Sequence, residues 1–327
     1  MNVAIIGCGL IGKKRALALG AHQLVWAVDP DIKRAQALAD LRPGAQVSQD
    51  FNDAIKDPHV DIIIISTTND KLAEISLASI KAGKHVLVEK PAARHFKEIE
   101  NVIRVSKEKR VMVKVGFNLR YHPALLKAME IVNSGVMGEL MFIRGRYGHG
   151  GRIGYDQEWR ANPAISGGGE LIDQGVHMID LCRWFLGDFI SVNGEAMTYF
   201  WKMPVDDNAF LALKTKKNQM AWLHVSCSEW KNMFSLEIYG KIGKIQIDGL
   251  GGSYGVEKLT YYQMLPEMGP PKTTVWEYPG EDVSWKLEFE ALVQAISTGA
   301  LLNGDIHDAY EALKIVDQIY NGSGGSK

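Results

Sequence analysis

The sequence predicts an α/β protein in which a doubly wound parallel sheet is followed by a second, α+β domain with a large, mostly antiparallel sheet. Three observations support this prediction. Short apolar runs alternate with helical segments up to about residue 118, a glycine-rich turn follows the first run, and strand-like segments succeed one another after residue 189. The length of 327 residues also suits two domains.

The first domain is expected over residues 1–118. Continuous apolar runs such as "NVAIIG" are typical of strands that are buried on both faces of a parallel sheet. The expected strands are 2–7, 24–29, 60–67, 85–91 and 111–117, and the expected helices are 8–21, 31–41, 71–83 and 95–110.

The second domain is expected over residues 119–320, with a flexible tail at 321–327 because "NGSGGSK" is of low complexity. Helical segments are expected at 122–135, 167–186, 285–297 and 304–320, and strands at 139–148, 208–215, 219–228, 234–240 and 244–249. Glycines over 148–158 favour a mobile lid or, equally, a solvated loop.

Composition excludes several classes of protein. The formal net charge is −1, which gives no bulk attraction to nucleic acid or to a membrane surface. The three cysteines are widely separated, so we expect no disulfide framework and no metal site, and a zinc alcohol dehydrogenase is excluded. No apolar run has the length of a membrane span. We therefore expect a soluble, cytoplasmic protein.

"VAIIGCGLIG" places Gly7, Gly9 and Gly12 in the G-x-G-x-x-G spacing between a strand and a helix. In this context the motif predicts a Rossmann dinucleotide site, with Leu10 and Ile11 at the start of the helix that faces the phosphates. The alternative is a glycine turn with no ligand.

Asp29 ends the second strand, 17 residues after Gly12. A carboxylate there accepts hydrogen bonds from the adenosine ribose and repels a 2′-phosphate, so the sequence favours NAD over NADP. The alternative role for Asp29 is to cap the next helix.

Two further segments carry polar groups where ligands bind. Lys90, in "EKP", follows a strand of the parallel sheet, and Pro91 after it permits a cis peptide bond. In "GGGELIDQGVHMID", the residues Asp173, His177 and Asp180 share one face of an otherwise apolar helix. Taken alone, Lys90 reads equally well as a surface lysine, and the pattern around His177 favours a core histidine.

Four segments in order, together with Asp29, resemble the glucose-fructose oxidoreductase and inositol dehydrogenase (Gfo/Idh/MocA) family: "GCGLIG", "AGKHVLVEKP", "GFNLRYHP" and "EWRANPAISGGGELIDQGVHMIDLCRWFLG". The resemblance implies a Rossmann domain followed by an open-sheet α/β domain. It implies hydride transfer between NAD(P) and a hydroxyl carbon of a sugar, nucleotide sugar or cyclitol. The family's lysine, aspartate and histidine correspond to Lys90, Asp173 and His177.

The resemblance also assigns cofactor contacts to Thr67, Thr68, Asn69 and Glu89. Two positions depart from the family pattern. Leu72 stands where many relatives have a histidine, and Thr68 stands where they often have proline.

The three implied catalytic residues suit alcohol oxidation. A neutral histidine accepts a hydroxyl proton near physiological pH, a contribution of about 100- to 10,000-fold in rate. The Lys90 cation stabilises a developing alkoxide. Asp173 holds the substrate hydroxyl or orients the imidazole, and Asp180 is expected to be a structural partner. Residues expected to bind substrate beside these three are Asn118, Arg120, Tyr147, Trp159 and Arg160.

The competing hypothesis is a dinucleotide-sensing regulator on the same fold without catalysis. The joint presence of Lys90, Asp173 and His177 favours the enzyme, since a sensor needs no proton relay.

The segment "QMAWLHVSCS" has apolar bulk on both faces of a strand, with Trp222 on one face and Leu223 on the other. "NAFLALKT" repeats the pattern. Because an antiparallel sheet usually leaves one face polar, we expect a homodimer or homotetramer joined through these sheets.

Overall fold

The structure, a computed structural model, describes residues 1–322. The chain divides into two compact units. Unit 1 contains residues 1–118, 164–167 and 285–313, and unit 2 contains residues 119–163, 168–284 and the chain from 314 onward. The tail expected at 321–327 lies outside the described residues, except for Asn321 and Gly322, which end the last helix.

Unit 1 is built on a six-stranded sheet in the order β3-β2-β1-β4-β5-β6, with every neighbouring pair parallel. This confirms the doubly wound sheet, because the strand order reverses direction between β1 and β4. Its strands are β1 (Asn2–Ile6), β2 (Gln23–Val28), β3 (Gln46–Ser48), β4 (Ile62–Ile65), β5 (His85–Val88) and β6 (Val113–Val115).

The helices that connect these strands are α1 (Leu10–Ala18), α2 (Ile32–Ala39), α3 (Phe51–Lys56), α4 (Asn69–Lys81) and α5 (Phe96–Lys109). The sequence reading missed β3 and α3, whose segment "QVSQDFNDAIK" is short and polar. The short helix α7 (Pro163–Ser166) and α9 (Ser284–Thr298) also lie largely in unit 1.

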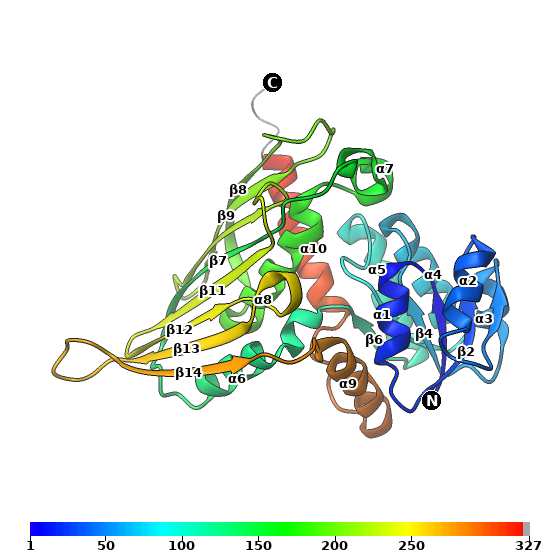
Figure 1. The fold of residues 1–327 in the computed structure, drawn as a ribbon, viewed down its shortest axis with the longest axis horizontal. Helices are drawn as coiled ribbons and strands as arrows, with labels where there is room; N and C mark the ends of the chain where they lie inside the picture. Colours follow the sequence, from blue (N-terminus) through cyan, green and yellow to red (C-terminus); the bar gives the residue numbers. More distant parts are fainter. Residues whose placement is uncertain (323–327) are drawn as a thin grey trace. The chain divides into compact units, whose positions relative to one another are not determined.

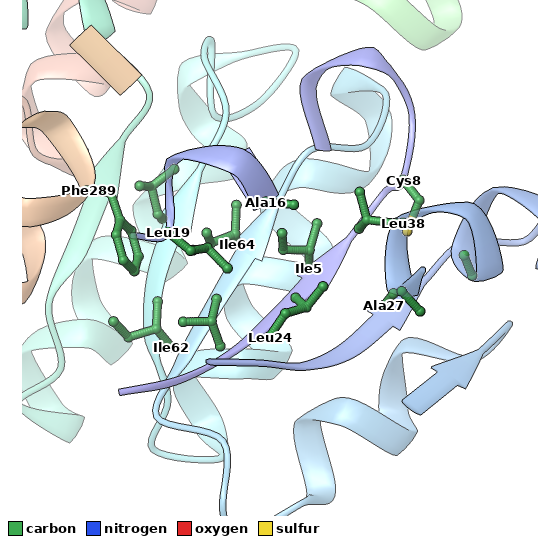
Figure 2. Close-up of a cluster of buried hydrophobic side chains, with 14 of the residues drawn as sticks. Ile5, Cys8, Ala16, Leu19, Leu24, Ala27, Leu38, Ile62, Ile64 and Phe289 are labelled. Carbon is green, nitrogen blue, oxygen red and sulfur yellow. The ribbon is translucent and has the colours of Figure 1, made fainter. Parts of the chain in front are cut away.

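The core of unit 1 includes a residue from far along the chain. Ile5, Leu24 and Ile64 of the sheet pack in one buried cluster with Leu19 of the α1 region, and Phe289 of α9 joins them (Figure 2). The boundary predicted at 118/119 coincides with the end of the first segment of unit 1. Assigning all of 119–320 to the second domain was wrong for 285–313, because Phe289 and Leu292 complete this core.

Unit 2 is built on an eight-stranded sheet in the order β14-β13-β12-β11-β7-β10-β9-β8. All neighbours are antiparallel except β7 and β10, which confirms a mostly antiparallel sheet. Its strands are β7 (Leu140–Gly148), β8 (Phe189–Met197), β9 (Asn208–Thr215), β10 (Met220–Ser226), β11 (Met233–Gly240), β12 (Gly243–Asp248), β13 (Glu257–Gln263) and β14 (Lys272–Tyr278).

The helices of unit 2 cover one face of this sheet (Figure 1). These are α6 (Pro123–Asn133) and α8 (Val176–Leu186), and α10 (Ile306–Gly322) contributes its second half. Alternate residues of β10 show the division: Leu223 is buried on the helix side, and Trp222 on the other side is 61% exposed. None of the helices formed by residues 1–322 combines the length and the apolar character needed to span a membrane.

Candidate active site

The phosphate loop connects β1 to α1, and its glycines meet different constraints. A Cβ on Gly7 would lie 2.5 Å from the Ser66 carbonyl oxygen, and one on Gly12 would lie 2.1 Å from the Gly7 carbonyl oxygen. At Gly9 a Cβ would meet no atom of residues 1–322 within 4 Å. Gly9 is the N-cap residue of α1 and has no side chain that could cap the helix. The first N–H groups of α1 therefore fit a pyrophosphate that approaches at this open position.

Asp29 is held against this loop. Its two carboxylate oxygens accept hydrogen bonds from the backbone N–H of Cys8, at 2.8 Å, and of Asp31, at 2.9 Å. The helix-capping alternative for Asp29 was wrong, because Asp31 is the N-cap of α2 and accepts from the Lys33 N–H. Asp29 is 7% exposed, and these two hydrogen bonds hold its carboxylate against the loop.

The segment after β4 also lies at the carboxyl edge of the sheet. Thr68 is the N-cap residue of α4, and its hydroxyl donates to the Asp70 carboxylate at 2.6 Å. The Asn69 amide donates to the Ser166 carbonyl at 2.8 Å. Leu72, at the position of the histidine of many relatives, is completely buried. These contacts orient the first turn of α4, and the cofactor contacts assigned to Thr67, Thr68 and Asn69 stay predictions.

Glu89 and Lys90 follow β5, and the Lys90–Pro91 peptide bond is cis. The Glu89 carboxylate accepts from Nε of Arg15 at 2.7 Å, and Nη1 of Arg15 lies 2.5 Å from the carboxylate of Glu288. Burial raises the pKa of Glu288, and the Arg15 cation opposes that rise. Glu89 is therefore engaged within unit 1 by an ion-pair network that the sequence reading did not find.

Trp285, the first residue of α9 in unit 1, stacks on this network. The Arg15 guanidinium lies 4.4 Å from the centre of the Trp285 ring, and Nζ of Lys14 lies 5.0 Å from it. The start of α9 thus contacts α1, which follows the phosphate loop directly. Through Arg15 it also supports Glu89, the residue before Lys90.

In unit 2, Asp173 and His177 lie on the segment predicted as a helix, but its start is not a regular α-helix. Leu171–Gly175 is π-helical and leads directly into α8. A single π-helical turn inside an α-helix is frequent at functional sites, because the wider turn re-aims side chains. The spacing of Asp173 and His177 is therefore not that of a regular α-helical face.

Asp173 has a basic partner, because Nε of Arg160 donates to its carboxylate at 3.1 Å. Burial opposes the charge of Arg160, but Asp173 beside it raises the pKa of the guanidinium. The Arg160 guanidinium also lies 4.5 Å from the centre of the Trp159 ring. The structure thus brings Asp173 to the adjacent residues Trp159 and Arg160, which the sequence analysis expects to bind substrate.

His177 lies beside aromatic side chains. The centre of its ring is 6.2 Å from that of Tyr147, in an edge-to-face arrangement, and the centre of the Tyr254 ring lies 5.6 Å from that of Tyr147. Burial raises the pKa of Tyr147 well above its usual value and raises that of Tyr254 to about 12. Both tyrosines therefore remain neutral hydrogen-bonding groups next to the histidine.

Arg120 and Asp180 form a buried pair. Nε of Arg120 donates to Oδ2 of Asp180 at 2.8 Å, and an Nη of Arg120 donates to Oδ1 at 2.6 Å. Both side chains are almost completely buried, which gives Asp180 the structural role expected of it. The bidentate pair also gives Arg120 a structural role, and its substrate contact stays a prediction. Asn118, at the end of unit 1, is buried, and its substrate contact stays a prediction.

Tyr254, Arg15 and Glu288 were missed by the sequence reading. Tyr254 lies in the irregular segment between β12 and β13, and Glu288 lies in a helix far from the phosphate loop. No sequence spacing connects Tyr254 or Glu288 with a site, because only tertiary packing brings Tyr254 to Tyr147 and Glu288 to Arg15.

A phosphate loop on a parallel sheet, and a second unit with a histidine and an aspartate on one helical segment, define a nucleotide-binding oxidoreductase architecture. Two family descriptions match this chain. Residues 1–117 match the oxidoreductase family with an NAD-binding Rossmann fold, and residues 125–246 match the GFO/IDH/MocA C-terminal domain. The chain belongs to the GFO/IDH/MocA family of oxidoreductases.

Known relatives fit this assignment. Levoglucosan dehydrogenase of Pseudarthrobacter phenanthrenivorans is 30% identical over 66% of this chain and 58% of its own length. Inositol 2-dehydrogenase 2 of Saccharopolyspora erythraea is 27% identical over 97% of this chain and 91% of its own. The solved structure of a levoglucosan dehydrogenase in complex with NADH and L-sorbose has the same fold, with a TM-score of 0.90, 23% identity, and coverage of 99% of this chain and 96% of the other.

Proposed function

We propose that this protein is an NAD-dependent dehydrogenase that oxidises a secondary alcohol of a sugar, nucleotide sugar or cyclitol, or that reduces the corresponding ketone. The observation that carries the proposal is the presence of Lys90, Asp173 and His177 at the family's three motif positions, with Asp173 held by Arg160. Relatives named as dehydrogenases of levoglucosan and inositol support the substrate class.

The residues of the chain divide the chemistry among them. Bound NAD supplies the acceptor for the hydride that leaves the substrate carbon. His177 takes the hydroxyl proton, so that the C–H and O–H bonds break as the C=O bond forms. Lys90 stabilises the negative charge that develops on the substrate oxygen. Asp173, oriented by Arg160, holds a substrate hydroxyl or the imidazole in position.

NAD rather than NADP is proposed because of Asp29. Its carboxylate is held at the end of β2 by two backbone N–H groups, where it would repel a 2′-phosphate. The loop residues Gly9, Leu10 and Ile11 are proposed to contact the pyrophosphate, since this start of α1 carries no side-chain cap.

Absorbance at 340 nm tests the proposal, with the protein, NAD and a panel of sugars, nucleotide sugars and cyclitols. Lys90→Ala and His177→Ala should each lower turnover by at least about 100-fold, as expected for a lost electrostatic or acid–base group. Lys81→Ala and His59→Ala, at exposed positions, are the matched controls. Near-wild-type turnover in either active-site variant would remove that residue from the mechanism. Binding of NAD without turnover of any alcohol would favour the sensor instead.

We also propose that unit 2 forms a homodimer, or a tetramer of such dimers, through the uncovered face of its sheet. We define this outer face by Phe142, Phe210, Met220, Trp222 and Tyr239. Four of these side chains are 36–61% exposed, and Phe142 stacks on Tyr239 with ring centres 4.3 Å apart. Several large exposed apolar side chains on one sheet face are typical of an interaction site on a soluble protein.

Light scattering at micromolar concentration tests this assembly. A mass near that of the 36.3 kDa monomer would contradict it. Trp222→Glu places a charge in the centre of the outer face and should shift the mass toward the monomer, whereas Met268→Glu, at an exposed position off this face, should not.

A further inference from the structure

We propose that Asp206 is a positioning residue for the catalytic helix, acting through a clamp on the backbone that begins it. The inference rests on the proposed function and concerns the segment that carries Asp173 and His177. Asp206 lies in the connection between β8 and β9, 29 residues after His177, and it is 6% exposed.

The clamp consists of several hydrogen bonds to three consecutive residues. The carboxylate of Asp206 accepts from the backbone N–H of Gly169 at 2.9 Å and from that of Leu171 at 2.7 Å. The backbone carbonyl of Asp206 accepts from the N–H of Glu170 at 2.9 Å. These are donors at the start of a helix, where no intrahelical acceptor exists.

Tyr320 of α10 closes the clamp. Its hydroxyl donates to Oδ1 of Asp206 at 2.7 Å and accepts from the Gly169 N–H at 3.1 Å. Burial raises the pKa of Asp206, and the hydrogen bonds from Leu171, Tyr320 and Gly169 oppose that rise. A carboxylate with three donors at a helix N-terminus is favourably placed for the helix dipole.

Two glycines of the triple, Gly168 and Gly169, follow from this geometry. A Cβ on Gly169 would lie 1.9 Å from the carbonyl oxygen of Asp206, and one on Gly168 would lie 2.2 Å from the hydroxyl oxygen of Tyr320. Only glycine therefore permits the clamp to approach the backbone this closely. The Asp173 N–H then donates to the Gly169 carbonyl at 3.1 Å, which connects the clamped residue directly to Asp173.

The clamp sets where the π-helical turn begins and hence where Asp173 and His177 are aimed. Displacement of a catalytic group by about 1 Å costs on the order of 100-fold in rate. In Asp206→Asn, one carboxylate oxygen becomes an NH₂ group that faces backbone donors. We expect kcat to fall by at least about tenfold, and the KM for NAD to stay within about twofold because unit 1 is untouched. Tyr320→Phe, which removes one hydroxyl, should lower kcat about threefold.

Asp207→Asn is the matched control. Asp207 is also buried, and it accepts from the N–H groups of Tyr199, Phe200 and Trp201, which belong to a different segment. If the clamp positions catalytic groups, Asp207→Asn and Asp206→Asn lower the thermal midpoint similarly, but only Asp206→Asn lowers kcat. The kinetic isotope effect, measured with substrate deuterated at the oxidised carbon, should rise in Asp206→Asn and Tyr320→Phe.

Equal losses of kcat in Asp206→Asn and Asp207→Asn would overturn the inference. A wild-type kcat and a wild-type isotope effect in Tyr320→Phe would also overturn the inference. This second variant keeps the test decisive if Asp206→Asn does not fold. Wild-type turnover and its loss in His177→Ala establish the proposed function separately. A failed clamp therefore cannot be confused with a failed assignment of the reaction.

Discussion

Changing Asp29 to serine tests the basis of cofactor preference and separates two effects of one carboxylate. The side chain holds the Cys8 N–H in the phosphate loop and would also meet the ribose. A hydrogen bond to a charged acceptor contributes about 1.5–3 kcal/mol, so loss of the Cys8 contact should weaken binding of every dinucleotide. Both NAD and NADP depend on the same loop, and this loss cancels in the ratio of their affinities.

The ratio of the affinities for NAD and NADP therefore reports only the interaction of residue 29 with the adenosine ribose and its 2′ substituent. Removing the negative charge relieves its repulsion of a 2′-phosphate and removes its hydrogen bonds to the ribose hydroxyls. We expect the preference for NAD over NADP to fall at least about tenfold, equivalent to about 1.4 kcal/mol. Dissociation constants for both dinucleotides, measured by titration calorimetry on the wild type and on Asp29→Ser, give the ratio directly.

Asp31→Ser is the control, because it removes a nearby exposed carboxylate and keeps a residue that caps α2. A wild type that prefers NADP would refute the reasoning. An unchanged ratio in Asp29→Ser would also refute it, and so would an equal change in Asp31→Ser, because that would indicate a general effect of charge.

Three further predictions concern stability. Glu288→Gln leaves the buried Arg15 cation with Glu89 as its one charged partner and should lower the free energy of unfolding by about 3 kcal/mol in thermal unfolding, and an unchanged free energy of unfolding would contradict this account of the pair. Arg144 and Lys244, against the opposing effect of burial, lower the pKa of Glu237 to about 2 from 4.5. This carboxylate therefore stabilises the fold above about pH 4.5 and loses that effect as the pH falls toward 2. The decrease in thermal midpoint caused by Glu237→Gln should consequently be smaller at pH 3 than at pH 6. An equal decrease at both pH values would contradict the lowered pKa of Glu237. Gly169→Ala should abolish soluble expression or lower the thermal midpoint sharply, because its Cβ has no space beside Asp206, while Gly280→Ala, where no described atom lies within 4 Å, should be tolerated.

The sequence predicted unit 1 well because its signals are local. Each buried strand is a short apolar run, and the glycine spacing of the phosphate loop lies within residues 7–12, at the turn between β1 and α1. The second unit was predicted less completely, since the partners of a strand are chosen by tertiary packing. Nothing in "ELMFIRGRYG" shows that β7 pairs in parallel with β10 between antiparallel neighbours.

The candidate site shows the same division. Asp173 and His177 could be chosen from their helical spacing and the family motifs, but their supports come from elsewhere in the chain. Arg160 was predicted to meet substrate, and its partner Asp173 follows only from the fold. Asp206 carried no sequence signal, because a buried aspartate in "VDDN" resembles any polar loop residue until its hydrogen bonds are known.

The return of α9 to unit 1 has a consequence for synthesis on the ribosome. Residues 1–118 emerge long before Phe289 and Leu292, which complete their core. At about 5–20 residues per second, some 170 further residues take roughly 10–35 s to translate. During that interval the apolar surface that later receives α9 stays open to water, to chaperones and to other nascent chains. A gene that ends before α9 should therefore yield an aggregation-prone nucleotide-binding unit, and the rate of translation through unit 2 becomes a determinant of the yield of folded protein.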